Sequence, residues 1–340
     1  MSERFLGEGD LLDRNGALAD SGYAFSQVRK YDRTAIKSRR LRIKEWDYYC
    51  FGDSRYAVAL TVADNSYMSL GSVSLLDFSR LGYITESKIG LLSKGKLGMP
   101  SDCGRGSVKF AKGGAEISFD TDADGKRELR CVFEKFRKKD TFECEITLEP
   151  YVGDNITVAV PFAKPRQFYY NTKVNCLRGS GRFSLGSEKY EFDNGSGCLD
   201  WGRGVWPYKN RWYWSSLSCD VDGNSFGLNL GYGFGQPTAT ENVIFYNGKA
   251  HKLGNVDFDI PYTFGEVNYL KPWTIKDDAG RLEVMFYPLV DRRDKMRALW
   301  LMTDQHQVFG RFYGKAVLDD GSIVSFADKP GFAERVINKW

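Results

Sequence analysis

Short runs of alternating hydrophobic and polar residues recur along the whole chain. The clearest run is 141–148, where Phe142, Cys144, Ile146 and Leu148 fall on one face and polar residues fall on the other. Similar runs occur at 73–78, 115–119, 181–185, 212–217, 225–230, 243–246, 282–287, 298–302, 311–318 and 323–326. A period of two residues is typical of half-buried β-strands, so the pattern predicts a chain made of many short strands.

Turn signals separate these runs and indicate how the strands are connected. Asp222-Gly223, Asn247-Gly248 and Asp320-Gly321 are dipeptides that accept positive φ angles, and they predict tight hairpins between antiparallel strands. Helix is expected to be minor, and its best candidate is 330–340, where Phe332, Val336 and Trp340 are four residues apart. The sequence therefore predicts an all-β fold of barrels or sandwiches.

Gly195-Ser196-Gly197 has the composition of a linker and lies past the middle of the 340 residues. We expect a first β domain at 1–195 and a second at 196–340, the second carrying a tryptophan-rich segment. No short sequence repeat relates the two halves, so any relation between them is expected to be structural.

Composition narrows the classes of function. Aromatic residues make up 15% of the chain and favour pleated sheets. The 48 Lys and Arg nearly balance the 44 Asp and Glu, and they form no long basic face, so nucleic acid is not expected as a partner. The apolar runs are shorter than the roughly 20 residues of a membrane span, which leaves open only a transient contact with a membrane surface.

Cysteine and histidine usage bears on location and on metals. The seven cysteines are odd in number and contain no Cys-x-x-Cys pair, and the chain has only two histidines. Neither a disulfide framework nor a metal site is therefore expected, and no cofactor is predicted. With no basic-then-apolar leader at the start, the sequence favours a cytoplasmic protein. Its oligomeric state is left open.

Four of the eight tryptophans fall within 199–214. In this segment Asp200 and Arg203 are close enough in sequence to pair, and Trp212 and Trp214 would lie on the same side of a strand. An apolar wall with indole N–H donors suits a ligand. The expected ligand-binding residues are Trp201, Arg203, Trp206, Tyr208, Trp212 and Trp214. The alternative is a cluster that closes a barrel, with an ordinary ion pair beside it.

Two further polar residues stand beside apolar strands and are candidates for proton transfer. Glu241 precedes 243–246, and a carboxyl whose pKa is raised by an apolar pocket can act as a general acid. His306 precedes Val308-Phe309-Gly310 and can carry a proton near neutral pH. Asp200 completes the predicted catalytic set by orienting the pocket. For each of them, taken singly, an ordinary hydrogen-bonded or exposed side chain is the commoner alternative, since structural pairs outnumber catalytic ones.

At these residues the sequence resembles a bacterial family, the domain of unknown function 2804. The blocks that carry the resemblance are 44–49, 168–171 with Lys173, 175–176, 199–208, 231–235, 239–242, 251–253, 305–310 and 331–334. The family is distantly similar to carotenoid hydratase and AttH-like proteins, which consist of two lipocalin-like (calycin) β-barrels, a scaffold also found in plant tocopherol cyclase and some fungal cyclising enzymes. The resemblance implies two such barrels and an apolar, often isoprenoid, ligand.

The leading hypothesis is a protein that binds a small hydrophobic molecule in an aromatic pocket, with hydratase, isomerase or cyclase chemistry in which Glu241 donates a proton and His306 relays it. The sequence leaves open whether a reaction occurs at all, and a non-enzymatic carrier of lipids or other hydrophobic molecules fits the same residues. Carbohydrate binding is a third hypothesis, since tryptophan and tyrosine platforms beside Asp, Asn and Arg also suit sugars, and a closely spaced carboxylate pair would mark a glycosidase.

Overall fold

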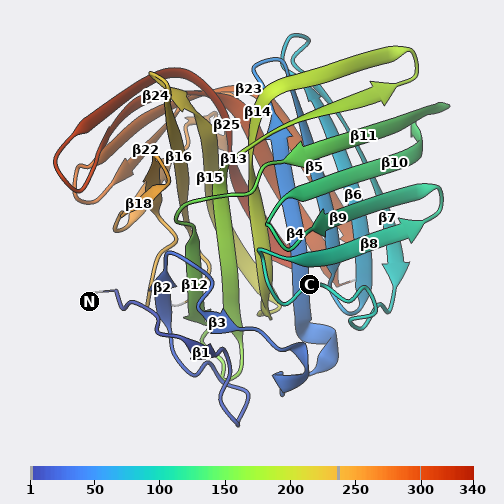
Figure 1. Ribbon diagram of the computed structural model, residues 1–340, viewed down its shortest axis with the longest axis vertical. Helices are drawn as coiled ribbons and strands as arrows, with labels where there is room; N and C mark the ends of the chain where they lie inside the picture. The colour runs from blue at the N-terminus through green and yellow to red at the C-terminus, as the bar shows by residue number, and fades with distance from the viewer. Residues whose placement is uncertain (1–2, 236–237, 299) are drawn as a thin grey trace.

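A computed structural model describes residues 3–235, 238–298 and 300–340. β-Strand makes up 65% of the chain and is arranged mainly as two large curled antiparallel sheets that lie against each other (Figure 1). The prediction of an all-β fold with two lipocalin-like halves is confirmed.

The first sheet has twelve strands, with the order β7-β6-β5-β4-β14-β13-β11-β10-β9-β8, and β12 pairs with both β13 and β2. Its strands are β2 (Gly22–Ala24), β4 (Ile43–Gly52), β5 (Tyr56–Asp64), β6 (Met68–Asp77), β7 (Gly82–Leu91), β8 (Gly106–Lys112), β9 (Ala115–Thr121), β10 (Arg127–Arg137), β11 (Asp140–Leu148), β12 (Ile156–Pro161), β13 (Phe168–Leu185) and β14 (Glu188–Val205).

The second sheet has nine strands in the order β18-β17-β16-β15-β25-β24-β23-β22-β19. They are β15 (Lys209–Val221), β16 (Asn224–Tyr232), β17 (Val243–Tyr246), β18 (Lys249–Lys252), β19 (Val256–Asp259), β22 (Trp273–Asp277), β23 (Leu282–Ala298), β24 (Leu301–Val317) and β25 (Ile323–Lys339). Two small pairs complete the strands, β1 (Gly9–Asp10) with β3 (Arg29–Lys30) and β20 (Tyr262–Thr263) with β21 (Glu266–Val267).

Helix in the described residues is limited to two 3-10 turns, η1 (Arg33–Ala35) and η2 (Arg40–Arg42). The predicted helix at 330–340 is wrong, because this segment belongs to β25 and pairs with β15 on one side and β24 on the other. Positions four residues apart share a face of a helix and also share a face of a strand, so the spacing of Phe332 and Val336 fits both structures. Among the described residues, no helix has the length and apolar character that crossing a membrane requires.

The expected domain boundary falls inside β14 rather than in a linker. Gly195 and Gly197 are strand residues there, and a Cβ on Gly197 would lie 2.2 Å from the carbonyl oxygen of Cys50 on the neighbouring strand. Gly197 therefore permits close backbone approach and Gly195 leaves room for the Phe51 ring, so both glycines serve packing within the sheet. The structure places the change from the first sheet to the second at Trp206–Tyr208, between β14 and β15.

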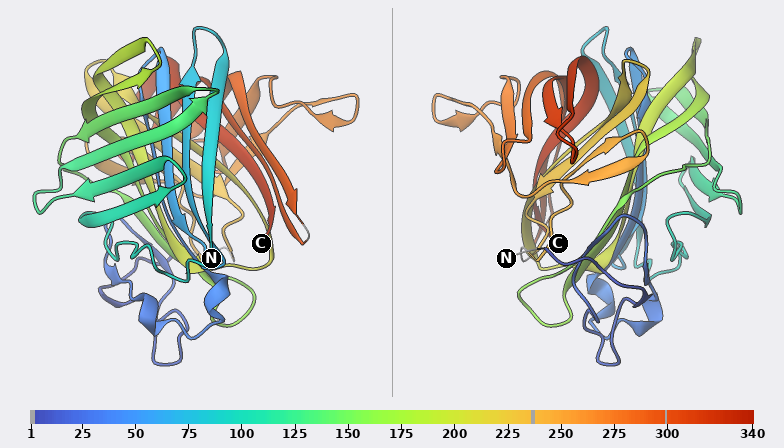
Figure 2. Two further views of the ribbon diagram at one scale, coloured as in Figure 1. Left: turned by 90° about the vertical axis from the view of Figure 1, so that its right-hand side faces the viewer. Right: turned by 60° about the vertical axis from the view of Figure 1, so that its left-hand side comes forward.

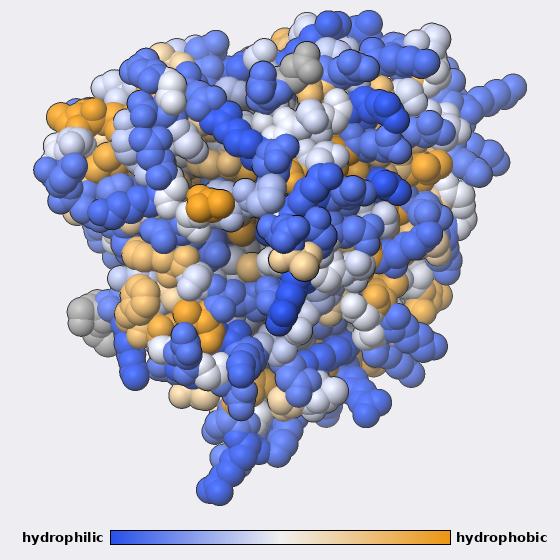
Figure 3. Space-filling model, viewed as in Figure 1, coloured by the Kyte–Doolittle hydropathy of each residue, from blue (hydrophilic) through white to orange (hydrophobic). Residues whose placement is uncertain are grey.

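Buried side chains form one apolar core in each sheet and two further clusters where the sheets meet. One of these joins Tyr48 and Leu76 of the first sheet to Trp214, Phe309 and Phe332 of the second. Figure 2 shows the sheets side by side, with the N-terminal segment that contains β1 and β3 at one end of the molecule. The face of the molecule seen in Figure 3 is mostly hydrophilic, with apolar residues in small groups. Most large apolar side chains of the two sheets are thus buried, either in the two cores or in the contact between the sheets.

Candidate functional site

A cavity of about 390 Å³ lies between the two sheets. β4, β5, β6, β7, β13 and β14 supply its walls from the first sheet, and β15, β23, β24 and β25 supply them from the second. Its lining is rich in aromatic rings: Trp46, Tyr48, Tyr67, Tyr169, Trp206, Trp212, Trp214, Phe234 and Trp340. Trp46, Tyr169 and Phe234 stack in sequence, with centroid separations of 6.4 Å and 5.1 Å, and make one continuous aromatic wall.

A buried lysine lines this cavity. Lys173 is 2% exposed, and its Nζ lies 2.9 Å from Oδ1 of Asp200 and 3.8 Å from Oε1 of Glu241. The same ammonium group lies 3.9 Å from the centroid of the Trp214 ring, a cation–π contact. Burial alone would lower the pKa of this lysine, but the charges of Asp200 and Glu241 outweigh that effect and raise it. Lys173 is therefore a fixed positive charge.

Asp200, on β14, is held by further donors. The amide Nδ2 of Asn171 donates to its Oδ1 at 2.6 Å, and the indole Nε1 of Trp46 donates to its Oδ2 at 3.1 Å. Tyr169 and Lys173 of β13 line the cavity, while the alternate residues Phe168, Tyr170 and Val174 belong to the first core. The orientation of the Asp200 carboxylate is fixed from three directions.

A second carboxyl enters the cavity from the opposite sheet. Glu334, on β25, is 4% exposed and accepts hydrogen bonds from Nε1 of Trp212 at 2.8 Å and from Nε2 of Gln307 at 3.0 Å. Burial raises the pKa of Glu334 to about 7, even though the bond from Trp212 opposes the rise. Glu334 is thus able to exchange a proton near neutral pH.

Glu241 is buried next to the cavity without lining it. Its Oε2 accepts a hydrogen bond from the hydroxyl of Tyr169 at 3.1 Å, and its backbone carbonyl accepts one from Asn229 at 2.8 Å. Burial raises the pKa of Glu241, and the nearby Lys173 only partly offsets this. Glu241 thus contacts two residues that line the cavity, Tyr169 and Lys173.

His306 does not meet the other candidates. It lies in a separate, polar cavity of about 540 Å³, stacked on Tyr269 with ring centroids 3.8 Å apart, and its Nδ1 lies 2.8 Å from Oδ2 of Asp291. The neighbouring Gln305 and Gln307 face the aromatic cavity, because adjacent residues of β24 point to opposite faces. The prediction that Glu241 and His306 act together in one pocket is therefore wrong.

The expected ion pair between Asp200 and Arg203 is also corrected. Arg203 points to the first core, where its Nη1 lies 2.9 Å from Oδ1 of Asp47 and its guanidinium lies 4.0 Å from the Trp201 ring. Trp201 belongs to the same core. Positions 201 and 203 of β14 fall on the face opposite to position 200, so these two predicted ligand-binding residues do not line the cavity.

The remaining tryptophans of the 199–214 segment are brought together as predicted. Trp206, Trp212 and Trp214 all line the cavity. Tyr208 lies at the surface, 38% exposed, and its hydroxyl donates to the backbone carbonyl of Trp300. Tyr208 is thus near the hairpin between β23 and β24 rather than in the cavity wall.

Sequence reasoning missed Lys173 and Glu334 as site residues. Lys173 entered only as part of a block of family resemblance, and Glu334 was assigned to the predicted helix. A usable signal was present in both cases. If 330–340 is taken as a strand, Phe332, Glu334 and Val336 share a face, and a charged residue between apolar ones indicates a buried, functional group.

The fold and this cavity define a class of protein, two lipocalin-like β units that enclose an aromatic site. The chain belongs to the family described as domain of unknown function (DUF2804), whose model matches residues 3–340. The resemblance drawn from the sequence blocks is confirmed.

One solved structure shows the same fold at low sequence identity. A structure from Nitrosomonas europaea described as AttH has a TM-score of 0.56 and 14% identity, covering 86% of this chain and 92% of that chain. Kievitone hydratase from Nectria haematococca has a TM-score of 0.48 and 12% identity, covering 87% of this chain and 88% of that chain. A search of curated proteins finds no match.

Proposed function

We propose that this protein binds a small hydrophobic molecule in the cavity between its sheets and performs acid–base chemistry on it through Glu334. The observation that carries the proposal is a buried carboxyl whose pKa is about 7, in a cavity lined by aromatic rings. A catalytic acid works best when its pKa lies near the working pH.

The size and lining of the cavity support a hydrophobic ligand. A volume of about 390 Å³ falls within the roughly 300–1,000 Å³ of typical small-molecule sites. Met68, Leu70, Leu301 and Met302 extend the aromatic wall with aliphatic groups. Lys173, Asp200 and Glu334 are the buried charged groups of the lining, and they suit a ligand that carries a polar or reactive group.

Hydration of an alkene is the reaction that this arrangement fits best. Protonated Glu334 gives its proton to one alkene carbon while the electron pair of the double bond forms the new C–H bond. Water adds to the second carbon, and its surplus proton returns to the Glu334 carboxylate, so the enzyme is regenerated. The faces of Trp212 and Trp214 would stabilise the positive charge that develops on carbon. Loss of water from an alcohol is the same sequence in reverse.

Asp200 and Glu241 act around this acid in the proposal. Asp200, oriented by Lys173, Asn171 and Trp46, presents a fixed acceptor for a hydroxyl group or for the attacking water. Glu241 is a positioning residue, since it holds Tyr169 and Lys173, which line the cavity. His306 lies in the other cavity and has no part in this reaction.

A reducing cellular compartment is part of the proposal. All seven cysteines are free thiols, six of them buried and Cys50 partly exposed. Burial raises the pKa of Cys198 and Cys103, as expected for inert structural thiols. These observations support the cytoplasm as the location.

The test begins with the ligand. Mass spectrometry of an organic extract of the purified protein identifies what occupies the cavity, and that molecule is then offered to the wild type and to Glu334→Gln. We expect the variant to keep the ligand affinity within a few fold and to lose turnover by about 10²-fold or more. Glu283→Gln is the matched control, because Glu283 is an exposed carboxyl on β23 of the same sheet.

Other outcomes have definite meanings. If cavity variants change only affinity and the wild type never converts the ligand, the protein is a carrier and the catalytic half of the proposal is wrong. A preparation that is always empty of apolar molecules and binds glycans would overturn both halves and favour the carbohydrate hypothesis.

A further inference from the structure

The hairpin formed by β23 and β24 extends beyond β22 at one end of the second sheet, while β25 pairs with β24 as far as Met302. The pairing of β22 with β23 ends at Phe286. From Val290 to Ala298, β23 is paired with β24. Arg292, Asp294 and Met296 on the inner face of this part line the aromatic cavity. The hairpin is therefore one wall of the cavity at the end where it meets solvent.

Exposed apolar side chains surround this end of the cavity. Trp300, in the turn of the hairpin, is 68% exposed, and Met296 is 37% exposed. Across the cavity, Ile89 of β7 is 41% exposed and lines the same space, and Leu91, on the same face of that strand, is 80% exposed. Large apolar groups gathered around an opening mark an interaction surface.

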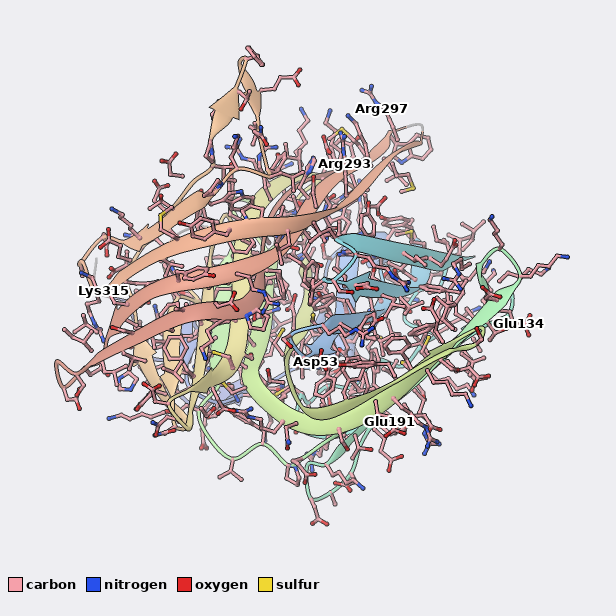
Figure 4. All side chains as sticks on the ribbon, turned by 90° about the horizontal axis from the view of Figure 1, so that it is seen from above. Asp53, Glu134, Glu191, Arg293, Arg297 and Lys315 are labelled. Atoms are coloured by element: carbon pink, nitrogen blue, oxygen red, sulfur yellow. The ribbon has the colours of Figure 1, made fainter. Side chains whose placement is uncertain are left out.

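The outer face of the same hairpin is basic. Arg293, Lys295 and Arg297 alternate with the cavity-lining residues of β23, and Figure 4 marks Arg293 and Arg297 along the hairpin. Asp304 is the carboxylate nearest to them, 4.0 Å from Arg293 and 3.9 Å from Lys295. On the outer face between positions 291 and 297, three basic residues stand beside one acidic residue, Asp291. The surface therefore combines positive charge, tryptophan and aliphatic side chains.

We propose that this rim, formed by the β23–β24 hairpin and the end of β7, docks on the surface of an anionic lipid bilayer. Tryptophan prefers the boundary between head groups and acyl chains, and arginine and lysine pair with anionic head groups. The cavity would then open toward the acyl region, so that a hydrophobic ligand passes into it without crossing water. This inference rests on the proposed function, since it assigns the route by which that ligand arrives.

Vesicle co-sedimentation of the full chain tests the docking. The wild type is expected to partition onto vesicles of equal parts phosphatidylcholine and phosphatidylglycerol, weakly onto phosphatidylcholine alone, and less at high salt. Lys295→Gln with Arg297→Gln should weaken partitioning about fivefold for each charge removed. Trp300→Ser should weaken it at both low and high salt, because its contribution is apolar.

Matched controls lie on the second sheet, away from the rim. Ile323→Ser removes a side chain that is 65% exposed at the start of β25, and Lys276→Gln with Lys315→Gln removes two exposed charges. The proposal is overturned if these controls lose as much partitioning as the rim variants, or if the rim variants bind anionic vesicles as well as the wild type does.

A vesicle-free measurement separates this inference from the proposed function. The affinity of the fluorescent apolar probe 1-anilinonaphthalene-8-sulfonate is expected to be unchanged in Trp300→Ser, because Trp300 lies outside the cavity lining. A loss of probe affinity equal to the loss of vesicle binding would contradict docking as the role of Trp300. If Glu334→Gln leaves turnover intact, the proposed chemistry is wrong, while the vesicle result stands by itself.

Discussion

Lys173 carries a positive charge at a place that is 2% exposed to water. Two carboxyl groups and the face of Trp214 replace the water that the ammonium group loses on folding. Breaking a buried ion pair from one side leaves an uncompensated charge, which is costlier than the pair itself is stabilising.

We predict that Lys173→Met lowers the free energy of unfolding at pH 7 by about 3–5 kcal/mol, since it leaves Asp200 buried without its cation. The loss should shrink on adding Asp200→Asn, because the neutral amide needs no counter-ion. Urea denaturation of both variants measures this. Lys276→Met, at an exposed position on β22, is the control and should change little; equal losses in the two single variants would contradict the prediction.

The raised pKa of Glu334 predicts how the free energy of unfolding changes with pH. Its pKa rises from 4.5 to about 7 on folding, so the folded state holds this proton more tightly than the unfolded state. Between those two pH values, stability is lost as pH rises, by up to about 3 kcal/mol from this group.

Replacing the carboxyl by an amide removes that titration. The stability of Glu334→Gln relative to the wild type should therefore increase from pH 5 to pH 8, as measured by urea denaturation at each pH. Glu283→Gln cannot give this sign, because the hydrogen bond from Lys276 lowers the pKa of Glu283. A difference between the Glu334 variant and the wild type that is flat with pH would show that Glu334 titrates normally.

At the scale of the element, β14 shows how glycine shapes the cavity. A Cβ on Gly202 would lie 2.1 Å from ring atoms of Trp46 on the adjacent β4. The absent side chain lets the indole lie across β14, where its Nε1 reaches Asp200. The position of Trp46 in the cavity wall therefore depends on this glycine.

Gly202→Ala is predicted to push Trp46 out of place, to destabilise the fold by about 1–3 kcal/mol and to weaken ligand binding. Calorimetry and titration of the fluorescent apolar probe measure the two effects. Gly82→Ala, on β7, is the control, because the nearest atom to its added Cβ would be 3.9 Å away. If Gly202→Ala binds the probe as the wild type does, Trp46 is not part of the binding wall.

Sequence reasoning reached the elements of this fold more easily than the site. Alternation gave strands such as β11 correctly, since one buried face produces the period directly. The spacing of apolar residues in 330–340 fits a helix and a strand equally well, so it did not distinguish the two structures. Within 199–214, composition located the aromatic groups, but the face of each residue depends on register. Hence Trp212 and Trp214 were placed together correctly, while Arg203 was paired with Asp200 across two faces of one strand.

The convergence of Lys173, Asp200 and Glu334 depends on contacts between strands far apart in the chain. No local pattern specifies that β13 faces β25 across the cavity. Gln307 lines the aromatic cavity, whereas its neighbour His306 faces the other cavity. The sequence does not specify which face of β24 points to which cavity, and the assignment of His306 to the same pocket was wrong for that reason.

At the scale of the whole molecule, the two sheets share buried contacts that neither can satisfy alone. Nδ2 of Asn175 on β13 donates to Oγ of Ser216 at 2.9 Å and to the carbonyl of Leu217 at 3.1 Å. Val158 and Val160 of the first sheet pack in one cluster with Val243 and Phe245 of the second. The sheets are therefore expected to unfold together.

We predict a single calorimetric transition for the intact chain, with the calorimetric and van't Hoff enthalpies in agreement. Residues 1–206 expressed alone should expose the contact face and bind 1-anilinonaphthalene-8-sulfonate strongly, or aggregate. Two resolved transitions, or a first half that is well folded alone, would show that the sheets are independent domains.

The site is divided between the two sides of the connection at Trp206–Tyr208. A genetic crossover at that connection would send Lys173 and Asp200 to one descendant and Glu334 to another, while leaving each sheet whole. A chimera of two relatives would then inherit opposite walls of its cavity from different parents. Ligand preference in such proteins is thus a property of the pairing of halves, and it could be recombined without altering any strand.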